Sequence, residues 1–478
     1  MDVLLIFVVT AAIFCLCKIR NLWKLNSTTK SSQIPLGSFG IWPFVGETIH
    51  FISSAYSDTP ESFVDKRRRT YGKVFKSHLF GSRTIVSSDA EVNKIILQSD
   101  ARTFIPSYPK SLMELMGKSS ILVINGSLQR RIHGLIGSFF KSATLKSQIT
   151  AEMERYVMES MGRWREDCPI YIQDEAKNIA FQVLAKALIS LDPGIQMEML
   201  KKYFQEFIAG LMSVPLNFPG TQLHRSLQAK RRMVKIIDGI IQEKRDCKGI
   251  NEGITKDVVD ALLNDKHEEL TDELIAENMI DLMIPGEDSV PVLMTLAIKY
   301  LSDCPAAISQ LTEENIKLKK VKEKLKEPFS WNDYVSSLPF TQTVITETLR
   351  MGNIITGVMR KAMKDVEIKG HLIPKGWCVF AYFRSVHLDD QLYDFPYHFN
   401  PWRWQDNNKE MSNGNFTPFG GGQRLCPGLD LARLEASIFL HHFVTQFRWE
   451  AEDDSIVNFP TVRMKRRMPV WIKRRRYS

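Results

Sequence analysis

Residues 417 to 428 read TPFGGGQRLCPG, and the segment that follows, LDLARLEASIFLHHFV, has the periodicity of a helix. Three consecutive glycines allow backbone N–H groups to converge in the loop, and Cys426 lies just before the predicted helix. Because a helix N-terminus and converging amide donors both favour an anion, this position favours a thiolate. A glycine turn before a helix, with Cys426 buried as a structural residue, explains the same letters.

The surroundings of Cys426 limit the kind of ligand that it could hold. No second metal-ligating residue lies close to it in the sequence, so a thiolate here suits attachment to a metal at a single point, as in haem iron. The chain has 7 cysteines, with no CxxC pair and no spacing typical of zinc sites. The sequence therefore predicts neither a zinc finger nor a disulfide framework.

Helical periodicity dominates the sequence upstream of this loop. From about residue 127 to 350, segments of ten or more residues have apolar positions at spacings of three and four, and one of them is predicted to begin near Trp331. Short β signals flank Gly81, in KVFKSHLF and RTIVSS, and return in VEIKGHLI and WCVFAYF. We therefore predict a mainly α fold with a minor β part.

The composition is that of a globular protein with a large core. Of 478 residues, 44% are hydrophobic and 24% are charged, and neither a flexible linker nor a repeat divides the chain. We predict one large domain over residues 48–478, behind a membrane anchor at 1–24 and a basic, Pro/Gly-rich hinge at 25–47. The net charge of +9 is partly concentrated at the C-terminal end, but no nucleic-acid motif accompanies it, so an acidic protein or a membrane surface is favoured over nucleic acid.

The first residues carry a membrane signal. The run VLLIFVVTAAIFCLC, from Val3 to Cys17, is uncharged, and Lys18 and Arg20 follow it directly. Such a run spans roughly 22 Å as a helix, which is short of a hydrocarbon core of about 30 Å unless neighbouring residues take part. Because the positive charge follows the run, the positive-inside rule leaves the rest of the chain in the cytosol. An uncleaved signal of a secreted protein is the alternative.

The cysteine loop resembles a known signature. It matches FxxGxRxCxG, the pattern of the cytochrome P-450 superfamily of haem-thiolate monooxygenases, at Phe419, Gly422, Arg424, Cys426 and Gly428. The resemblance implies haem b as the cofactor, with Cys426 as the axial iron ligand and Arg424 paired with a haem propionate. It also implies that Phe419 and Gly420 contact the cofactor. Electron donation from a thiolate favours O–O cleavage, and an arginine fork suits a carboxylate.

A second constellation is predicted to be structural. Glu347 and Arg350, in VITETLRM, stand three residues apart on a predicted helix and can pair on one face. Their apolar flanks indicate that the pair is buried. The resemblance adds Arg403, in FNPWRW, as the third member of the superfamily's Glu-Arg-Arg lock behind the haem.

The resemblance also suggests further partners for the propionates. Arg360, in GVMRKAMKDVEIKG, matches a position that reaches the haem carboxylates in many relatives. In LQRRIHGLI, Gln129 and His133 stand where the superfamily has its W/HxxxR pair. Both can donate hydrogen bonds, although His133 would need protonation to match the charge of arginine. Arg130 is an alternative partner, and a solvated surface role explains it equally well.

The segment from Thr271 to Asp303 has the pattern of one apolar helix, interrupted by MIPGEDSVPV. Pro285 and Pro291 have no N–H for the carbonyls of Asp281 and Glu287, so two intrahelical hydrogen bonds are lost. Either two helices are joined by a turn there, or one long helix is bent open with water in the gap. The residues alone favour the first arrangement, and the resemblance to the superfamily favours the second.

In the superfamily, the helix across the distal haem face carries (A/G)Gx(D/E)T(T/S), which PGEDSV matches imperfectly. Gly286 keeps the close approach to the cofactor, whereas Pro285 replaces a small residue. Asp288 and Ser289 supply the acid and a hydroxyl, and together these groups can relay protons. We therefore predict Asp288 and Ser289 as catalytic residues, with Glu287 shaping the oxygen pocket beside them.

The resemblance covers nearly the whole chain. Runs such as LMGKSSIL, GLMSVPLNFPGT and LRMGNIITGVMRKA are most similar to the plant brassinosteroid branch, above all to its steroid C-23 hydroxylases. This implies hydroxylation of the side chain of a C-22-hydroxylated campestane-type steroid, with electrons from NADPH through a diflavin reductase of the endoplasmic reticulum membrane. The alternatives are the same chemistry at C-22 or C-3 or on a triterpenoid, and a membrane-anchored protein that binds steroid or haem without turnover.

Overall fold

The computed structural model describes residues 33–40, 46–246, 255–265, 270–405, 414–459 and 461–476. The predicted anchor and most of the predicted hinge lie outside these residues. The chain forms two compact units, one of residues up to Ser107 with Thr356–Val386, and one of Tyr108–Ile355 with the residues from His387 onward. The predicted domain at 48–478 spans both units, and its boundaries stay a prediction.

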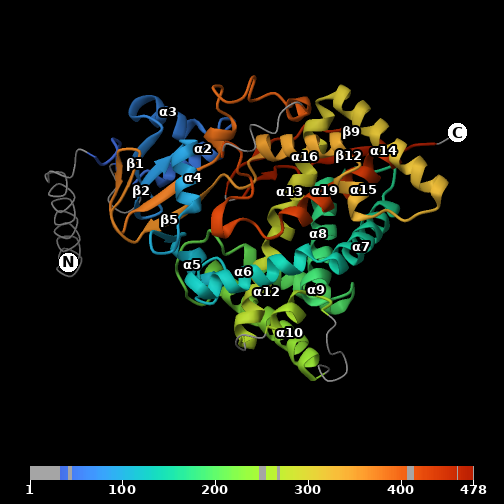
Figure 1. Ribbon diagram of the computed structural model, residues 1–478, viewed down its shortest axis with the longest axis horizontal. Coiled ribbons are helices and arrows are strands. Elements are labelled where there is room, and N and C mark those ends of the chain that lie inside the picture. The colour runs from blue at the N-terminus through green and yellow to red at the C-terminus, as the bar shows by residue number, and fades with distance from the viewer. Residues whose placement is uncertain are drawn as a thin grey trace, which may run out of the picture. The chain divides into compact units, whose positions relative to one another are not determined.

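The first unit is built on a five-stranded sheet of order β1-β2-β8-β5-β3 (Figure 1). Its strands are β1 (Val74–Leu79), β2 (Ser82–Ser87), β8 (Cys378–Tyr382), β5 (Gly357–Ala362) and β3 (Phe104–Pro106). β2 and β8 run parallel and the other neighbours run antiparallel. Phe80 and Gly81 connect β1 and β2 with positive φ angles of 50° and 78°, as a two-residue hairpin requires. The β signals around Gly81 are therefore confirmed.

Short elements complete the first unit. They are α2 (Thr48–Ala55), α3 (Ser62–Tyr71), α4 (Ala90–Gln98), β6 (Val366–Ile368) and β7 (His371–Ile373), and α17 (Arg384–His387) follows at its end in sequence. β6 and β7 form a hairpin within the predicted β segment VEIKGHLI, and β8 lies within WCVFAYF. Both of these predictions are confirmed.

The second unit is mainly helical. Its longer helices are α6 (Gly126–Lys141), α7 (Ala143–Gly162), α8 (Ile172–Ile189), α9 (Ile195–Ile208), α10 (Gln222–Asp246), α12 (Asp272–Asp288), α13 (Val290–Ser302), α14 (Pro305–Leu325), α16 (Pro339–Gly352) and α19 (Leu429–Gln446). The shorter ones are α5 (Lys110–Met116), α11 (Val258–Leu263), α15 (Trp331–Val335), η2 (Pro401–Trp404) and η3 (Gly422–Arg424). The predicted fold class, mainly α with a minor β part, is confirmed.

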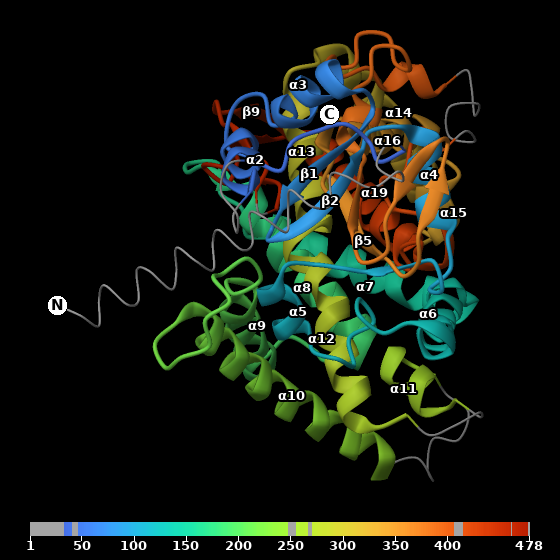
Figure 2. The same ribbon diagram turned by 90° about the vertical axis from the view of Figure 1, so that its left-hand side faces the viewer.

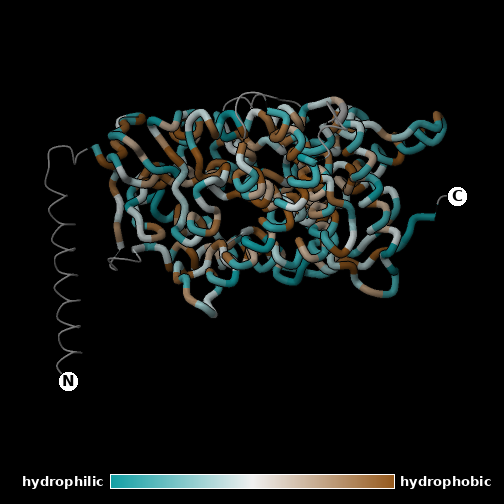
Figure 3. Tube along the Cα trace, turned by 90° about the horizontal axis from the view of Figure 1, so that it is seen from below, coloured by the Kyte–Doolittle hydropathy of each residue, from teal (hydrophilic) through white to brown (hydrophobic). Residues whose placement is uncertain are grey.

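Helix α8 lies in the interior of the second unit. Of its 18 residues, 12 are buried, and it packs against α7, α12 and α13. α10 packs against α9 and α12, as Figure 2 shows. Figure 3 shows the corresponding alternation of hydrophobic and hydrophilic residues along the helices, whose apolar faces meet in one hydrophobic core. This core fixes the positions of α12, α13 and α19, which carry the candidate site.

Local signals explain where several helices begin. The side chain of Thr271 accepts a hydrogen bond from the N–H of Leu274 and caps α12.

The prediction of a single long helix from Trp331 is wrong, because α15 ends at Val335 and α16 begins at Pro339. Pro339 has no N–H with which to extend a preceding helix, but it suits the first position of a new one, and α16 begins at this residue.

Two small sheets of the second unit were not expected from the sequence. A three-stranded sheet of order β4-β12-β9 joins β4 (Ile170–Tyr171) to β12 (Pro469–Arg474) and β9 (Phe447–Ala451), and β10 (Ile456–Val457) pairs with β11 (Arg463–Met464).

Within the described ranges, no single helix has both the length and the apolar composition to span a membrane. One pair of consecutive helical segments meets both requirements when taken together, Asp272–Ser302 with Pro305–Leu325, but the pair is bent by 118°.

Candidate active site

The cysteine loop is shaped by its own backbone. Gly420 and Gly422 have φ angles of +74° and +64°, in the left-handed region that glycine adopts without strain. The N–H of Cys426 donates to the carbonyl oxygen of Phe419 at 3.1 Å, and this hydrogen bond closes the loop. Cys426 is therefore presented just before the N-terminus of α19, as the sequence predicts.

The environment of the Cys426 thiol differs from the expectation. Although part of the residue is accessible, protein atoms surround its sulfur, and this desolvation raises the pKa of the thiol. The backbone N–H of Gly428 lowers the pKa and is the smaller effect. In the protein alone, burial therefore outweighs the effect of the neighbouring N–H on the pKa of this thiol.

A bound metal would change this balance, since a coordinating thiol loses its proton. One thiol in a closed loop, next to a single N–H donor, fits a metal held through one sulfur, as in a haem-thiolate centre. The donor set at the loop therefore fits the group that the sequence implies.

Arg424 reaches the segment that precedes α6. Its guanidinium donates to the carbonyl oxygens of Ile121 and Ile124, at 3.0 and 2.5 Å, and to Oδ1 of Asn125 at 2.9 Å. The structure thus shows Arg424 tying the cysteine loop to residues 121–125. Its pairing with a propionate stays a prediction.

Helix α6 contacts the same loop through two predicted site residues. The side-chain amide of Gln129 donates to the carbonyl oxygen of Gln423 at 3.4 Å. Nε2 of His133 lies 2.7 Å from the carbonyl oxygen of Leu425, which requires a proton on that nitrogen. The structure therefore brings Gln129 and His133 to the cysteine loop, where each binds backbone rather than another side chain.

The predicted lock is assembled in full. Arg350 donates to both oxygens of Glu347, at 2.9 and 2.8 Å, and Arg403 donates to Oε1 at 3.1 Å. The indole of Trp404 and the backbone N–H of Asn400 also donate to this carboxylate. Glu347 and Arg350 are fully buried, and Arg350 also binds two backbone carbonyls. Every hydrogen-bonding group of the carboxylate is therefore satisfied inside the core.

His387 links this lock to the cysteine loop and was missed from the sequence. Its carbonyl oxygen accepts a hydrogen bond from Arg350 at 2.9 Å. Its Nε2 accepts from the N–H of Thr417 at 3.1 Å, so the ring proton lies on Nδ1, which donates to Asn353 at 2.7 Å. All of these partners are distant from His387 in the sequence, and no motif marks the residue, which explains why the sequence did not predict its role.

The interrupted helix stays helical through the prolines, although Pro285 and Pro291 donate no hydrogen bond. α12 continues past Pro285 to Asp288, and α13 begins at Val290, so only Ser289 is irregular, with φ −122° and ψ −61°. The N–H of Ser289 donates to the carbonyl oxygen of Pro285, and the carbonyl oxygen of Ser289 accepts from Leu293, both at 3.0 Å. The segment is therefore one nearly continuous helix, and two helices joined by a longer turn are not what the sequence forms.

The predicted catalytic residues face different neighbours. A Cβ atom on Gly286 would lie 2.6 Å from Leu184, so this glycine permits close packing of α12 on α8. Glu287 is buried and pairs with Lys177 of α8, with 2.6 Å between Nζ and Oε1. Its contact with α8 makes Glu287 a partner of Lys177, which the sequence did not suggest.

Asp288 and Ser289 are half-buried side by side in the chain. Desolvation raises the pKa of Asp288, and Glu287 raises it further, while Lys177 and Arg463 lower it. A carboxyl group with a raised pKa retains its proton at higher pH and can donate it. The two residues that the relay requires therefore lie where α12 ends, at Asp288 and at the irregular Ser289.

Asp281, one turn before Pro285, was also missed. It is 5% exposed, and burial raises the pKa of its carboxyl to about 7. Ser120 and the backbone N–H of Ile121 lie near enough to lower the pKa, but neither carboxyl oxygen has a hydrogen-bond partner of good geometry. An acid inside the otherwise apolar run MIDLMIP was the only available signal.

Arg360 lies on β5 of the first unit. Its side chain is buried, and its Nη1 donates to the carbonyl oxygen of Met359 at 3.0 Å. Its contact with the cofactor stays a prediction.

The fold and the loop around Cys426 define a haem-thiolate class of protein. The sequence profile of the cytochrome P-450 family matches residues 36–468. The chain belongs to the cytochrome P-450 family and is a haem-thiolate monooxygenase. Membership implies haem bound through a cysteine thiolate and electrons from a redox partner.

Known relatives cover most of the chain. It is 65% identical to 3-epi-6-deoxocathasterone 23-monooxygenase CYP90D1 of Arabidopsis thaliana, over 94% of this chain and 93% of that protein. It is 42% identical to 3beta,22alpha-dihydroxysteroid 3-dehydrogenase of the same plant, over 93% of each chain. The solved structure of a retinoic acid-bound cyanobacterial CYP120A1 has the same fold, with a TM-score of 0.80 over 92% of this chain and 99% of that one, at 24% identity.

Proposed function

We propose that this enzyme hydroxylates C-23 in the side chain of a C-22-hydroxylated campestane-type steroid, a step of brassinosteroid biosynthesis. The observation that carries the proposal is the 65% identity, over nearly the whole chain, to a plant steroid 23-monooxygenase. The match extends over 94% of this chain rather than over one motif.

The residues at the cysteine loop would hold haem b. Cys426 would hold its iron through the thiolate, and Phe419, Gly420 and Gly286 would be among the residues that contact the cofactor. Its propionates would be bound by Arg424, Gln129, His133 and Arg360. When bound, the haem supplies oxygen activation, with electrons from NADPH through a membrane-bound diflavin reductase.

Asp288 and Ser289 would carry protons to the site of oxygen chemistry. Desolvation raises the pKa of Asp288, so this carboxyl keeps its proton to a higher pH than a solvated aspartate does, and the Ser289 hydroxyl can accept and donate in turn. Glu287, held by Lys177, would fix the orientation of the helix around them. The lock of Glu347, Arg350 and Arg403 would keep the segment before the cysteine loop rigid.

The predicted location completes the proposal. Residues 1–24 would anchor the protein in the endoplasmic reticulum membrane, with 25–47 as a hinge and the catalytic domain in the cytosol. An apolar steroid partitions into the bilayer, so an enzyme anchored there meets its substrate at a raised local concentration.

Oxidation at C-3 is the second candidate. It is supported by the 42% identity to a plant 3beta,22alpha-dihydroxysteroid 3-dehydrogenase over nearly the whole length of both proteins. The lower identity makes this candidate the weaker of the two.

A product assay separates the candidates. The purified full chain is incubated with the reductase and a panel of C-22-hydroxylated steroids, with and without NADPH, and the products are located by mass spectrometry. We expect an NADPH-dependent hydroxyl on the side chain. A ketone at C-3 would support the second candidate, and binding of steroid without any product would contradict both.

A further inference from the structure

The first part of the cysteine loop borders a cavity. Thr417 and Phe419 line this cavity of about 590 Å³, whose other walls include residues of α15, α16 and α19. Gly420 and Gly422, with positive φ angles, add conformational freedom to the backbone that follows. Packing therefore leaves one side of the loop unsupported, so the hydrogen bonds at its entry matter for its position.

Thr417 connects this entry to Cys426 through backbone hydrogen bonds. Its carbonyl oxygen accepts from the N–H of Gly420 at 3.0 Å, and within the same turn the carbonyl oxygen of Phe419 accepts from the N–H of Cys426 at 3.1 Å. The N–H of Thr417 itself donates to Nε2 of His387 at 3.1 Å. His387 therefore supplies a side-chain acceptor to the turn that leads to the cysteine.

The direction of the hydrogen bonds at His387 is fixed at both ends. They run from the N–H of Thr417 to Nε2, from Nδ1 to Oδ1 of Asn353 at 2.7 Å, and from Nδ2 of Asn353 to the carbonyl oxygen of Arg350 at 2.7 Å. A backbone N–H can only donate and a backbone carbonyl can only accept, so the ring is neutral with its proton on Nδ1. Because His387 is 1% exposed, water does not replace either partner.

The backbone and one ring face of His387 are also held. Its carbonyl oxygen accepts from Nη1 of Arg350 at 2.9 Å, and the centre of its ring lies 5.4 Å from that of Phe416. Asn353 follows the end of α16 with a φ angle of 42°, a left-handed conformation that asparagine tolerates. The acceptor that meets Thr417 is therefore positioned by the end of α16, the helix that carries Glu347 and Arg350 of the lock.

We propose that His387 is a positioning residue for the thiolate ligand. Nε2, rather than the bulk of the ring, holds the entry of the cysteine loop, and with it Cys426, in one arrangement. Loss of this acceptor leaves the N–H of Thr417 without its partner and allows the turn at 417–420 to shift. The role rests on the proposed binding of haem through Cys426.

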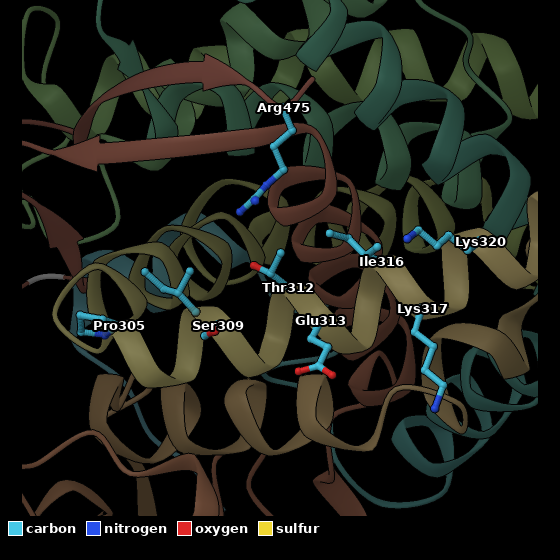
Figure 4. Close-up of a pocket in the computed structure, with 9 residues that line it drawn as sticks. Pro305, Ser309, Thr312, Glu313, Ile316, Lys317, Lys320 and Arg475 are labelled. Atoms are coloured by element: carbon cyan, nitrogen blue, oxygen red, sulfur yellow. The ribbon is translucent and has the colours of Figure 1, made fainter. Parts of the chain in front are cut away.

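His441 offers a matched control. It is also 1% exposed, and its Nδ1 lies 2.9 Å from Oδ1 of Asn315, so it too is a buried histidine paired with an asparagine. Asn315 belongs to α14, which Figure 4 shows beside a groove of about 650 Å³ that no residue of the cysteine loop lines. Replacement of His441 by phenylalanine therefore removes a comparable contact without affecting the hydrogen bonds of the loop.

The haem-thiolate absorption of the reduced, CO-bound, full-length protein is followed in urea below the unfolding transition, and the urea midpoint measures global stability. His387→Phe should lose this absorption about tenfold faster than the wild type, because a backbone N–H is left unpaired. His387→Gln, whose amide oxygen can reach the position of Nε2, should stay within about threefold of the wild type. His441→Phe should lower the urea midpoint but leave the rate of loss within about twofold.

A wild-type rate in His387→Phe would overturn the role of His387. So would an equally fast loss in His387→Phe and His441→Phe, which would reduce His387 to a contributor to general stability. Equal rates in His387→Phe and His387→Gln would assign the effect to the ring and contradict the role of its acceptor.

If His387→Phe takes up no haem, His387→Asn replaces it in the comparison. The shorter amide keeps the contact with Asn353 but does not reach Thr417, so it should lose the absorption faster than His387→Gln, and equal rates would overturn the role. A Cys426→Ser protein that keeps the haem-thiolate absorption would instead refute the proposed ligand, whatever the His387 variants show.

Discussion

Two clusters of buried charge in the helical unit differ in how completely they are satisfied. In the lock, both oxygens of Glu347 accept hydrogen bonds from neighbouring donors. In α12, both oxygens of Asp281 and one oxygen of Glu287 have no hydrogen-bond partner among the described residues. The first cluster lies beside the cysteine loop, and the second lies in the helix that carries the predicted proton relay.

The difference separates a structural role from a chemical one. A fully satisfied buried network holds its members in one arrangement, whereas an unsatisfied buried group has a free energy cost that persists only where something else compensates. We therefore expect changes in the lock to affect stability, and changes in α12 to affect proton-dependent behaviour. Mutations of the two regions test this division.

The largest effect is expected at the loop that the lock supports. Cys426→Ser removes the only sulfur of the loop, so the reduced, CO-bound protein should lose its haem-thiolate absorption and activity should fall below about 1%. Because the substitution is nearly isosteric, circular dichroism should show a similar helix content. Retained haem-thiolate absorption would show that another residue is the ligand.

Glu347→Ala should break the lock. It leaves Arg350 and Arg403 buried without their counter-charge, which is expected to cost about 3 to 5 kcal/mol in the free energy of unfolding. Urea denaturation measures this, with Glu323→Ala as the control. Glu323 belongs to an exposed pair with Lys319, and its loss should change stability by less than about 0.5 kcal/mol. If both substitutions change the free energy of unfolding by a similar amount, the buried lock contributes no more to stability than an exposed ion pair, which would contradict its structural role.

Asp281 should make stability depend on pH. Its pKa is about 7 in the folded protein and near 3.8 when unfolded, so the folded state binds the extra proton between these values. The contribution of Asp281 to the free energy of unfolding is therefore fully present below about pH 4 and falls as pH rises to about 7. Between pH 5 and 7.5 the loss should be about 2 to 3 kcal/mol.

Asp281→Asn should remove this part of the pH dependence. Urea midpoints of the wild type and the variant, measured at pH 5 and pH 7.5, give the difference directly. An identical pH dependence in both proteins would mean that Asp281 has an ordinary pKa in the folded state.

The smallest effect is expected at the irregular residue of the helix. Ser289→Ala should lower the amount of product formed per NADPH by about threefold or more, while NADPH oxidation changes less, because proton delivery is impaired. Ser289→Thr keeps a hydroxyl and should retain coupling. A fully coupled alanine variant would refute the relay.

The sequence predicted the parts of the site that depend on local pattern. The glycines before Cys426, the spacing of Glu347 and Arg350, and the acid next to Ser289 are all visible in the letters. The effect of burial on the pKa of the Cys426 thiol could not be predicted from the sequence, because desolvation depends on atoms brought from elsewhere in the chain.

Other features are set by tertiary contacts and leave no local mark. His387 acts through Thr417 and Asn353, and Lys177 meets Glu287 across 110 residues of sequence. The C-terminal sheet pairs β4 with β12 over a still longer separation, and its short strands have no clear periodicity. Similarly, the break between α15 and α16 depends on Pro339, which overrides the apolar pattern of the segment.

A labelled substrate tests the central claim most directly. A C-22-hydroxylated campestane steroid that carries two deuterium atoms at C-23 is incubated with the enzyme, its reductase and NADPH, and the product is analysed by mass spectrometry. Hydroxylation at C-23 predicts a product that gains one oxygen atom and loses one deuterium. A product that gains oxygen and keeps both deuterium atoms would contradict the assignment.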